Sequence, residues 1–272
     1  MKKLFLILAL FATGVHAQVQ VPKNMQSSVW VYNTTQNRVE YDQNSRAVRP
    51  IASVTKLMTA LVALDHDTNL TRILSLSNRV DTHLPRQRYN RGQLLQAMLV
   101  KSDNAAAETL AHDYPGGRAA FIARMNAQAQ EWGMTHTKFE DPTGLGANNI
   151  SNAAELATLL KMSANNWLLQ HTTTRKQVAL ESHIKNRVQT VSLNNTNSLL
   201  LNQFDNIVVG KTGLTSRAGW CVGIVANQNA DQYVIIVLGA TTKHARFQTV
   251  EKLMHTHVNA YELAETKLTL AQ

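Results

Sequence analysis

An apolar stretch over residues 52–65 constrains the fold of this 272-residue chain more than any other segment. On a helix, its large apolar side chains would cover nearly every side: Val54, Leu57, Met58, Leu61, Val62 and Leu64. A helix whose surface is apolar all round is stable only when it is buried. We therefore expect a helix here at the centre of the protein, with other elements covering it.

The rest of the chain divides into an α-helical middle region and β-prone ends. Helical periodicity covers residues 93–100, 105–112, 118–132 and 153–165, and β-prone runs cover residues 28–32, 38–41, 177–180, 207–212, 219–226 and 232–238. A closing amphipathic helix repeats apolar residues at three- and four-residue steps from Phe247 to Tyr261. Because an isolated hairpin is only marginally stable, we expect the strands of both ends to join one antiparallel sheet flanked by helices, an α+β fold.

The N-terminus has the pattern of a secretory signal peptide. Lys2 and Lys3 precede an apolar run over residues 4–15, and Ala17 is a small residue at a suitable cleavage point. The run is too short to span a bilayer, which requires about 20 residues. The sequence thus predicts a signal peptide over residues 1–17, a single domain over residues 18–272, export to the periplasm, and no transmembrane anchor. Removal of the two lysines lowers the formal charge from +9 to +7.

Composition excludes several classes of partner. The basic residues are dispersed and not interleaved with aromatic residues, so no nucleic acid is expected. The densest basic stretch, which comprises Arg79, Arg86, Arg88 and Arg91, is interpreted as a solvated loop, and the alternative is a patch that steers an anionic substrate. Cys221 is the single cysteine, and the ten histidines show no metal-binding spacing. We expect neither a metal nor a cofactor.

Ser53 and Lys56 open the apolar helix with the chemistry of an activated nucleophile. A spacing of three residues places the hydroxyl and the amine on one face of the first turn. Burial and a second cation both disfavour the ammonium form, and neutral lysine can accept the serine proton. Ser182 and Lys185 share this spacing, but in a polar stretch without an apolar helix behind it. For Ser53 taken alone, an ordinary helix N-cap is the alternative.

Two further motifs favour the catalytic interpretation. Ser102-Asp-Asn104 lies between two predicted helices, and Lys211-Thr-Gly213 ends a predicted strand. Ser-x-x-Lys, Ser-Asp-Asn and Lys-Thr-Gly together are the signature of penicillin-binding proteins and class A β-lactamases. All three motifs in this order are much harder to reach by chance than any one of them.

Longer segments resemble the low-molecular-mass penicillin-binding proteins, which are D-alanyl-D-alanine carboxypeptidases and endopeptidases, and most of all the penicillin-binding protein 7 type of endopeptidase. These segments are residues 49–60, 111–117, 141–145, 195–197, 210–215 and 218–219. The resemblance implies a β-lactamase/transpeptidase-like fold and a serine D,D-peptidase. It further implies peptidoglycan peptide stems as substrate, cleavage of D-alanyl-diaminopimelate cross-links, and covalent inhibition by β-lactams. Other wall hydrolases are candidate partners.

The resemblance also implies catalytic roles. Ser53 would be acylated, Lys56 would be its base, and Ser102 would relay a proton to the leaving amine. The substrate-binding residues would be Asn104, Lys211, Thr212, Gly213, Leu214, Thr215 and Arg246. Among them, Asn104 would hold a peptide carbonyl and Lys211 would supply a positive charge. Thr212, Thr215 and Arg246 would face a carboxylate, and the N–H groups of Ser53 and Leu214 would form the oxyanion hole.

Three alternatives stay open. A D-alanyl-D-alanine carboxypeptidase would use the same residues. A serine β-lactamase would need a loop glutamate for deacylation, and Glu140 is the candidate, but the Asp-Pro-Thr-Gly-Leu that follows it is the peptidase-like pattern. A non-catalytic β-lactam sensor should carry a transmembrane segment, and a scaffold protein would have no need of all three motifs.

Overall fold

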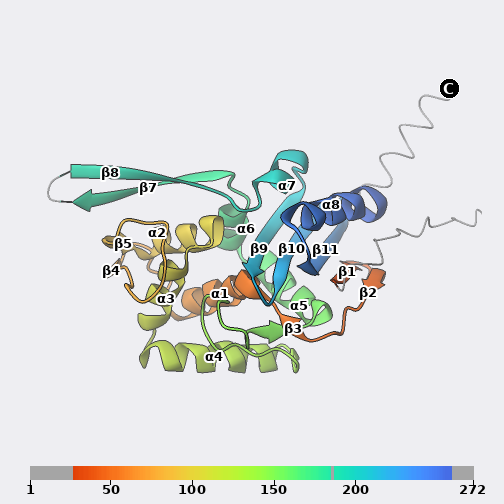
Figure 1. Ribbon diagram of the computed structural model, residues 1–272, viewed down its shortest axis with the longest axis horizontal. Coiled ribbons are helices and arrows are strands. Elements are labelled where there is room, and N and C mark those ends of the chain that lie inside the picture. The colour runs from red at the N-terminus through yellow and green to blue at the C-terminus, as the bar shows by residue number, and fades with distance from the viewer. Residues whose placement is uncertain (1–26, 185–186, 259–272) are drawn as a thin grey trace, which may run out of the picture.

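A five-stranded antiparallel sheet joins the two ends of the chain in the computed structural model, which describes residues 27–184 and 187–258 (Figure 1). The strand order is β2-β1-β11-β10-β9. The strands are β1 (Ser28–Asn33), β2 (Arg38–Gln43), β9 (Ile207–Thr215), β10 (Gly219–Gln228) and β11 (Asp231–Ala240). Val31 of β1 lies opposite Ile235 of β11. The prediction that both ends of the chain share one sheet is confirmed, and the predicted signal peptide lies outside the described residues.

Helices cover both faces of this sheet. The side chains of β1, β10 and β11 alternate between two cores, since Trp30 and Ile236 belong to one and Val31 and Ile235 to the other. Helix α5 (Ala153–Ala164) packs on the first face, and α8 (Lys243–Leu253) on the second. The other helices are α1 (Lys56–His66), α2 (Arg91–Gln96), α3 (Asn104–His112), α4 (Gly117–Glu131), α6 (Trp167–Thr173) and α7 (Ser198–Gln203).

Helix α1 is the central helix that the sequence predicts. Leu57, Met58, Ala60 and Val62 are buried, and α3, α4 and α5 pack around the helix. It begins later than expected, because Ala52–Thr55 forms a separate 3-10 turn (η1) before it. The nucleophile candidate therefore lies in a turn that precedes the helix, and the base candidate is the first residue of the helix.

Some strands and helix ends differ from expectation. The run expected over residues 177–180 is β7 (Gln177–Ile184), which pairs with β8 (Arg187–Asn194) in a separate hairpin that projects from the body (Figure 1). The apolar residues of this hairpin, Val178, Leu180 and Leu193, are buried in the larger of the two cores. The predicted strand therefore belongs to the hairpin and not to the main sheet. Two further two-stranded sheets are present: β3 (Arg49–Pro50) pairs with β6 (Ile150–Ser151), and β4 (Ile73–Ser75) pairs with β5 (Arg88–Asn90).

Two helices end in π-helical turns. Helix α2 continues into η2 (Ala97–Lys101), and α8 continues into η3 (Met254–Val258). Tyr261, the expected last apolar residue of the closing helix, lies outside the described residues. The turn η2 leads directly into Ser102, so it sets the point at which the chain enters the candidate site.

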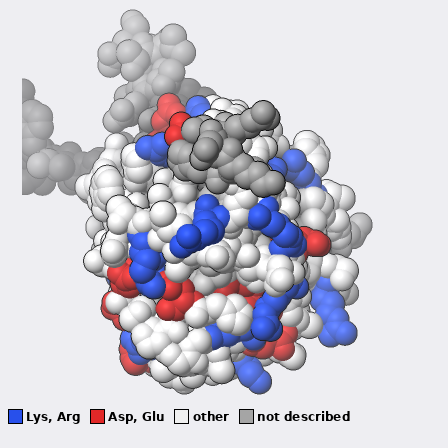
Figure 2. Space-filling model, turned by 90° about the vertical axis from the view of Figure 1, so that its left-hand side faces the viewer, with Lys and Arg blue, Asp and Glu red and all other residues white. Residues whose placement is uncertain are grey.

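The basic stretch is only partly a solvated loop. Arg91 is 1% exposed, pairs with Asp113, and donates hydrogen bonds to the carbonyl oxygens of Ala63 (2.8 Å) and Asp67 (3.0 Å) at the end of α1. The prediction for Arg91 was wrong, because its guanidinium is buried and binds two carbonyl oxygens at the end of α1 as well as Asp113. Figure 2 shows the face at the left-hand end of Figure 1, where acidic side chains lie among the basic ones. Among the described residues, no helix is both long and apolar enough to cross a bilayer.

Candidate active site

Ser53 and Lys56 lie within hydrogen-bond distance at the start of α1. The Nζ atom of Lys56 lies 2.9 Å from Oγ of Ser53. Ser53 is half-buried, whereas Lys56 is fully buried. Ala52 has a positive φ of 47°, a conformation that is strained for a residue with a Cβ and that recurs at functional sites. The strained turn directs the serine hydroxyl toward the lysine that follows it.

Two further acceptors hold the Lys56 amine. Nζ also lies 2.8 Å from Oδ1 of Asn104, the first residue of α3, and 2.6 Å from the carbonyl oxygen of Thr143. Three different segments therefore meet at this one nitrogen, which has its full set of three partners. The arrangement fixes the amine beside Ser53.

Burial lowers the pKa of Lys56 to about 7. The negative charges of Asp141, Asp103 and Glu108 act in the opposite direction and keep the pKa from falling further. A lysine with such a pKa exchanges its proton near neutral pH, whereas an exposed lysine stays protonated. Lys56 can therefore act as a base toward Ser53.

Ser102 and Lys211 form a second hydroxyl and amine pair. Nζ of Lys211 lies 2.9 Å from Oγ of Ser102 and 3.0 Å from the carbonyl oxygen of Thr212. Ser102 has a φ of 66°, in the left-handed region, at the junction between η2 and α3. Burial, and then the positive charges of Lys56 and Arg246, hold the pKa of Lys211 well below its usual value. The structure thus brings together all three sequence motifs around Ser53.

Strand β9 forms the other wall of the site. A Cβ at Gly213 would lie 2.9 Å from the backbone nitrogen of Ser53, so the strand passes this turn at a distance that only glycine permits. The next residue, Leu214, is 47% exposed. Oγ1 of Thr212 donates to Oγ1 of Thr196 at 2.6 Å, and Oγ1 of Thr215 accepts from the backbone of Ala218 at 3.0 Å. Both threonines that were expected to bind a carboxylate lie in this strand.

Arg246 supports β9 from the side of α8. Its side chain is 2% exposed, and Nη1 donates to the carbonyl oxygens of Cys221 (3.0 Å) and Gly213 (3.4 Å). The guanidinium carbon lies 5.2 Å from the ring centroid of Trp220 and 4.3 Å from that of Phe247. Burial lowers its pKa to about 10. In this structure the guanidinium therefore contacts the strand that carries Lys211 to Thr215.

The loop after Glu140 holds a residue to which the sequence alone assigned no role. The buried carboxylate of Asp141 accepts hydrogen bonds at 2.7 Å from the backbone of Thr143, Gly144 and Gly146, from the hydroxyl of Thr143, and from the side chain of Asn149. Hydrogen bonds to the ionised form lower the pKa of Asp141, although burial alone would raise it. This carboxylate shapes the loop whose Thr143 carbonyl binds Lys56.

Gly144 brings the same loop against the turn η1, which carries Ser53. It has a φ of 82°, and a Cβ there would collide with the carbonyl oxygen of Ala52. The sequence signal for this loop was the Asp-Pro-Thr-Gly pattern, in which an acidic residue precedes residues that it can bond through their backbone N–H groups.

Two expectations concern groups near the site. The carboxylate oxygens of Glu140 accept from the backbone and the side chain of Asn148, both at 2.8 Å, so in this structure Glu140 holds the loop. Within residues 27–184 and 187–258, no cluster of His, Cys, Asp and Glu side chains has the arrangement of a metal site.

Comparisons with known proteins agree with the fold and the motifs. A family model of D-alanyl-D-alanine carboxypeptidases, peptidase family S11, matches residues 15–242. The D-alanyl-D-alanine endopeptidase of Escherichia coli is 36% identical over 254 residues, which are 90% of this chain and 81% of that protein. The enzyme of the same name from Pseudomonas aeruginosa is 35% identical over 236 residues, 83% of this chain and 75% of that protein.

Solved structures share the fold along most of both chains. Penicillin-binding protein D2 of Listeria monocytogenes, in a cefotaxime-bound form, is 31% identical with a TM-score of 0.74, over 84% of this chain and 95% of that chain. A variant of the Streptomyces K15 DD-transpeptidase is 25% identical with a TM-score of 0.79, over 84% of this chain and 96% of that chain. The chain therefore belongs to peptidase family S11, the low-molecular-mass penicillin-binding proteins, and has their α+β transpeptidase-like fold.

Proposed function

We propose that this chain is a serine D,D-peptidase that opens D-alanyl-diaminopimelate cross-links in peptidoglycan through an acyl-enzyme on Ser53. The observation that carries the proposal is the position of Lys56. Its buried amine lies 2.9 Å from Oγ of Ser53, and its pKa is lowered to about 7. The family match and the relatives named D-alanyl-D-alanine endopeptidase support the same activity.

In the acylation step, the neutral amine of Lys56 accepts the proton of Ser53, and Oγ attacks the carbonyl carbon of D-alanine. The negative charge that forms on the carbonyl oxygen is stabilised by the backbone N–H groups of Ser53 and Leu214. Two such donors contribute about 3 to 4 kcal/mol each in related hydrolases. The tight approach of Gly213 to Ser53 brings the Leu214 backbone next to the nucleophile.

Ser102 completes the step by protonating the leaving amine. Its hydroxyl gives a proton to the amine nitrogen as the peptide bond breaks, and it is resupplied by an adjacent protonated lysine. Lys211 lies 2.9 Å from this hydroxyl. The positive charge of Lys56 lowers the pKa of Lys211, so Lys211 gives up a proton more readily once Lys56 has taken the proton of Ser53. Water then attacks the ester carbonyl, releases the product acid and restores the hydroxyl of Ser53.

The remaining residues hold the substrate. Asn104 accepts from Lys56 through Oδ1, so its amide nitrogen is the group that donates to a substrate peptide carbonyl. The hydroxyls of Thr212 and Thr215 bind the α-carboxylate beside the scissile bond. Arg246 acts through β9, because its guanidinium binds the Gly213 carbonyl and its charge acts on Lys211. We assign Arg246 as a positioning residue.

The same site would accept a β-lactam antibiotic, whose amide mimics the D-alanyl carbonyl and acylates Ser53. The cefotaxime-bound and ampicillin-bound forms of the Listeria relative support this assignment. The activity belongs outside the cytoplasm, where peptidoglycan lies, and the predicted signal peptide directs the chain to the periplasm. Other wall hydrolases stay candidate partners.

Covalent labelling tests the nucleophile. Ser53→Ala should abolish labelling by a fluorescent penicillin, and peptide mapping of the wild-type protein should find the label on Ser53. Ser182→Ala, in the other Ser-x-x-Lys segment, is the matched control and should keep full labelling. Label that persists on Ser53→Ala would overturn the assignment.

A further inference from the structure

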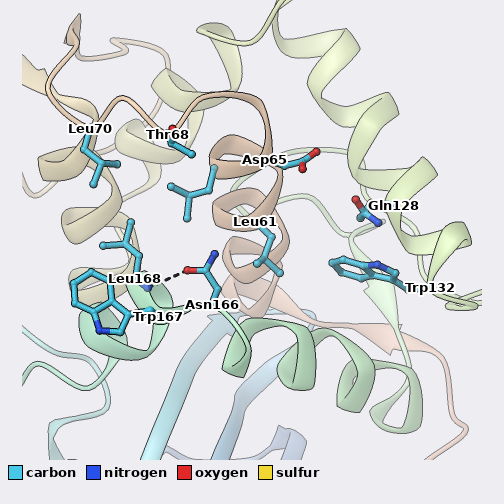
Figure 3. A pocket seen from close by; sticks show the side chains of 10 residues that line it. Leu61, Asp65, Thr68, Leu70, Gln128, Trp132, Asn166, Trp167 and Leu168 are labelled. Carbon is cyan, nitrogen blue, oxygen red and sulfur yellow. Dashed lines mark hydrogen bonds between the residues drawn. The ribbon is translucent and has the colours of Figure 1, made fainter.

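A pocket of about 450 Å³ lies at the end of α1 that is remote from Ser53 (Figure 3). Its walls come from the last turns of α1 and α4, the start of α6, and the loop that follows α1. Lys56 and Asp65 are nine residues apart on α1, which corresponds to about 14 Å at the usual helical rise. The volume is that of a small-molecule site, and its place separates it from the peptidase chemistry.

Two tryptophans line this pocket from different helices. Trp167, the first residue of α6, is 70% exposed, which is unusual for so large an apolar side chain. Its indole stacks on the ring of His171, with centroids 5.1 Å apart and an interplanar angle of 10°. His171 thus covers one face of the indole, and the residue as a whole stays largely exposed. Trp132 lies across the pocket at the end of α4 (Figure 3).

Polar groups surround the aromatic rings. Asp65, Thr68, Gln128 and Asn166 line the pocket together with leucines. Oδ1 of Asn166 accepts from two backbone N–H groups of α6, so its amide nitrogen is left as a donor toward the pocket. Asp65 is the one charged residue among the ten that line the pocket, and no lysine or arginine is among them. Nη2 of Arg124 lies 3.9 Å from the Asp65 carboxylate but does not line the pocket, so a phosphate or carboxylate ligand would meet no cation among the lining side chains.

We propose that this pocket binds an uncharged N-acetylated sugar of a glycan strand. A pyranose ring presents a face of C–H groups that packs on an open indole, and an edge of hydroxyl and amide groups that bond to carboxylate and amide side chains. An aromatic platform, amide groups and a lining without lysine or arginine fit that chemistry together. The inference rests on the proposed function, because the substrate peptides of a peptidoglycan hydrolase are attached to such sugars.

A second point of attachment has a direct consequence for catalysis. When the glycan is bound at the remote end of α1, the peptide stems attached to it stay near the active site. Their effective concentration at the active site is therefore raised. The effect should appear only when peptide and glycan belong to one polymer. A peptide substrate without sugar should not respond to changes in the pocket.

Calorimetric titration with the tetramer of N-acetylglucosamine tests the binding site. The wild-type protein should bind it, and Trp167→Ala should weaken binding at least about tenfold. Leu199→Ala removes another exposed apolar side chain, 51% exposed on α7, and should bind as the wild type does. Absence of binding to the wild type, or equal binding to both variants, would overturn the proposal. Choline is the competing ligand to test, because aromatic rings also bind quaternary ammonium ions, and its preferential binding over the tetramer would overturn the proposal as well.

An activity comparison separates this proposal from the proposed function. Trp167→Ala should hydrolyse intact peptidoglycan several-fold more slowly than the wild type, yet split sugar-free cross-linked peptide dimers at the same rate and keep full penicillin labelling. A loss on both substrates would mean that Trp167 is structural, which overturns the sugar site. If the wild type splits neither substrate, the peptidase assignment fails, while the sugar titration still decides the pocket.

Discussion

The carbonyl oxygen of Thr143 lies 2.6 Å from Nζ of Lys56, so a loop 87 residues away in sequence contacts the amine that we propose as the catalytic base. Asp141 determines the shape of that loop through its hydrogen bonds to Thr143 and Gly144. Its negative charge also raises the pKa of the buried lysine against the effect of burial. The position and the protonation of Lys56 therefore both depend on one buried carboxylate.

The acylation rate should follow the protonation state of Lys56. Its pKa is lowered from 10.5 to about 7, so the neutral form dominates above about pH 7 and the ammonium form below. We expect the rate of penicillin acylation to rise about tenfold per pH unit below pH 6 and to level off above about pH 8. Stopped-flow measurements across this range check it. A profile whose single inflection lies near pH 10 would mean that Lys56 is not the base.

The variant Asp141→Asn should shift this profile to lower pH. The negative charge of Asp141 raises the pKa of Lys56, whereas burial lowers it. Without that charge, the pKa of Lys56 should fall further. The plateau rate should fall as well, since the asparagine amide cannot accept all the hydrogen bonds that hold the loop. The matched control is Glu140→Gln, the neighbouring carboxylate that bonds Asn148, and its inflection should stay in place. A shift of the Asp141→Asn inflection to higher pH would contradict this account.

The close contact between Gly144 and Ala52 predicts that Gly144→Ala impairs acylation, and Gly133→Ala is the matched control. Gly144 and Gly133 have φ values of 82° and 72°, so alanine at either position incurs a similar backbone strain of about 1 to 2 kcal/mol. Only at Gly144 does the new Cβ collide with the backbone of η1, the turn that carries Ser53, whereas at Gly133 no atom lies within 4 Å. Gly144→Ala should therefore lose acylation at least about a hundredfold and unfold at a lower temperature. Gly133→Ala should show only the small change in melting temperature. Equal acylation rates in the two variants would show that the contact does not control Ser53.

The sequence predicted those parts of the fold that depend on local patterning. The all-round apolar pattern from Val54 to Leu64 predicted the central helix, and the three catalytic motifs predicted which residues meet. The detached hairpin of β7 and β8 was not predictable, because the alternation of a strand shows that one face is buried but not which element covers it. The ion pair of Arg91 was missed for a related reason, since a charged residue carries no signal of a distant partner such as Asp113.

The strained backbone conformations of Ala52 and Ser102 could not be predicted from the sequence either. Alanine and serine do not favour positive φ, so their conformation is imposed by tertiary packing around η1 and η2. The role of Asp141 lies between these cases. Its pattern was visible, but its connection to Lys56 depends on a loop that meets α1 only in the folded chain.

The last prediction concerns the bond that is cut. An endopeptidase must accept a bulky diamino-acid residue after the scissile D-alanine carbonyl, whereas a carboxypeptidase releases a terminal D-alanine. Both leaving groups carry an α-carboxylate beside the broken amide, so Lys211, Thr212 and Thr215 can serve either reaction. The likeness to two D-alanyl-D-alanine endopeptidases, at 36% and 35% identity, favours the first.

We therefore expect cross-linked dimers to be split to monomers faster than terminal D-alanine is released from pentapeptides. Chromatography of both digests over time measures the two rates with one enzyme preparation. Rapid formation of tetrapeptide from pentapeptide, with the dimers left intact, would make the enzyme a carboxypeptidase. Lys56→Ala should stop both reactions, because deprotonation of Ser53 is common to them and general-base help contributes about 10²- to 10⁴-fold. If that variant lost only one of the two activities, Ser53 would not be activated in the same way in both.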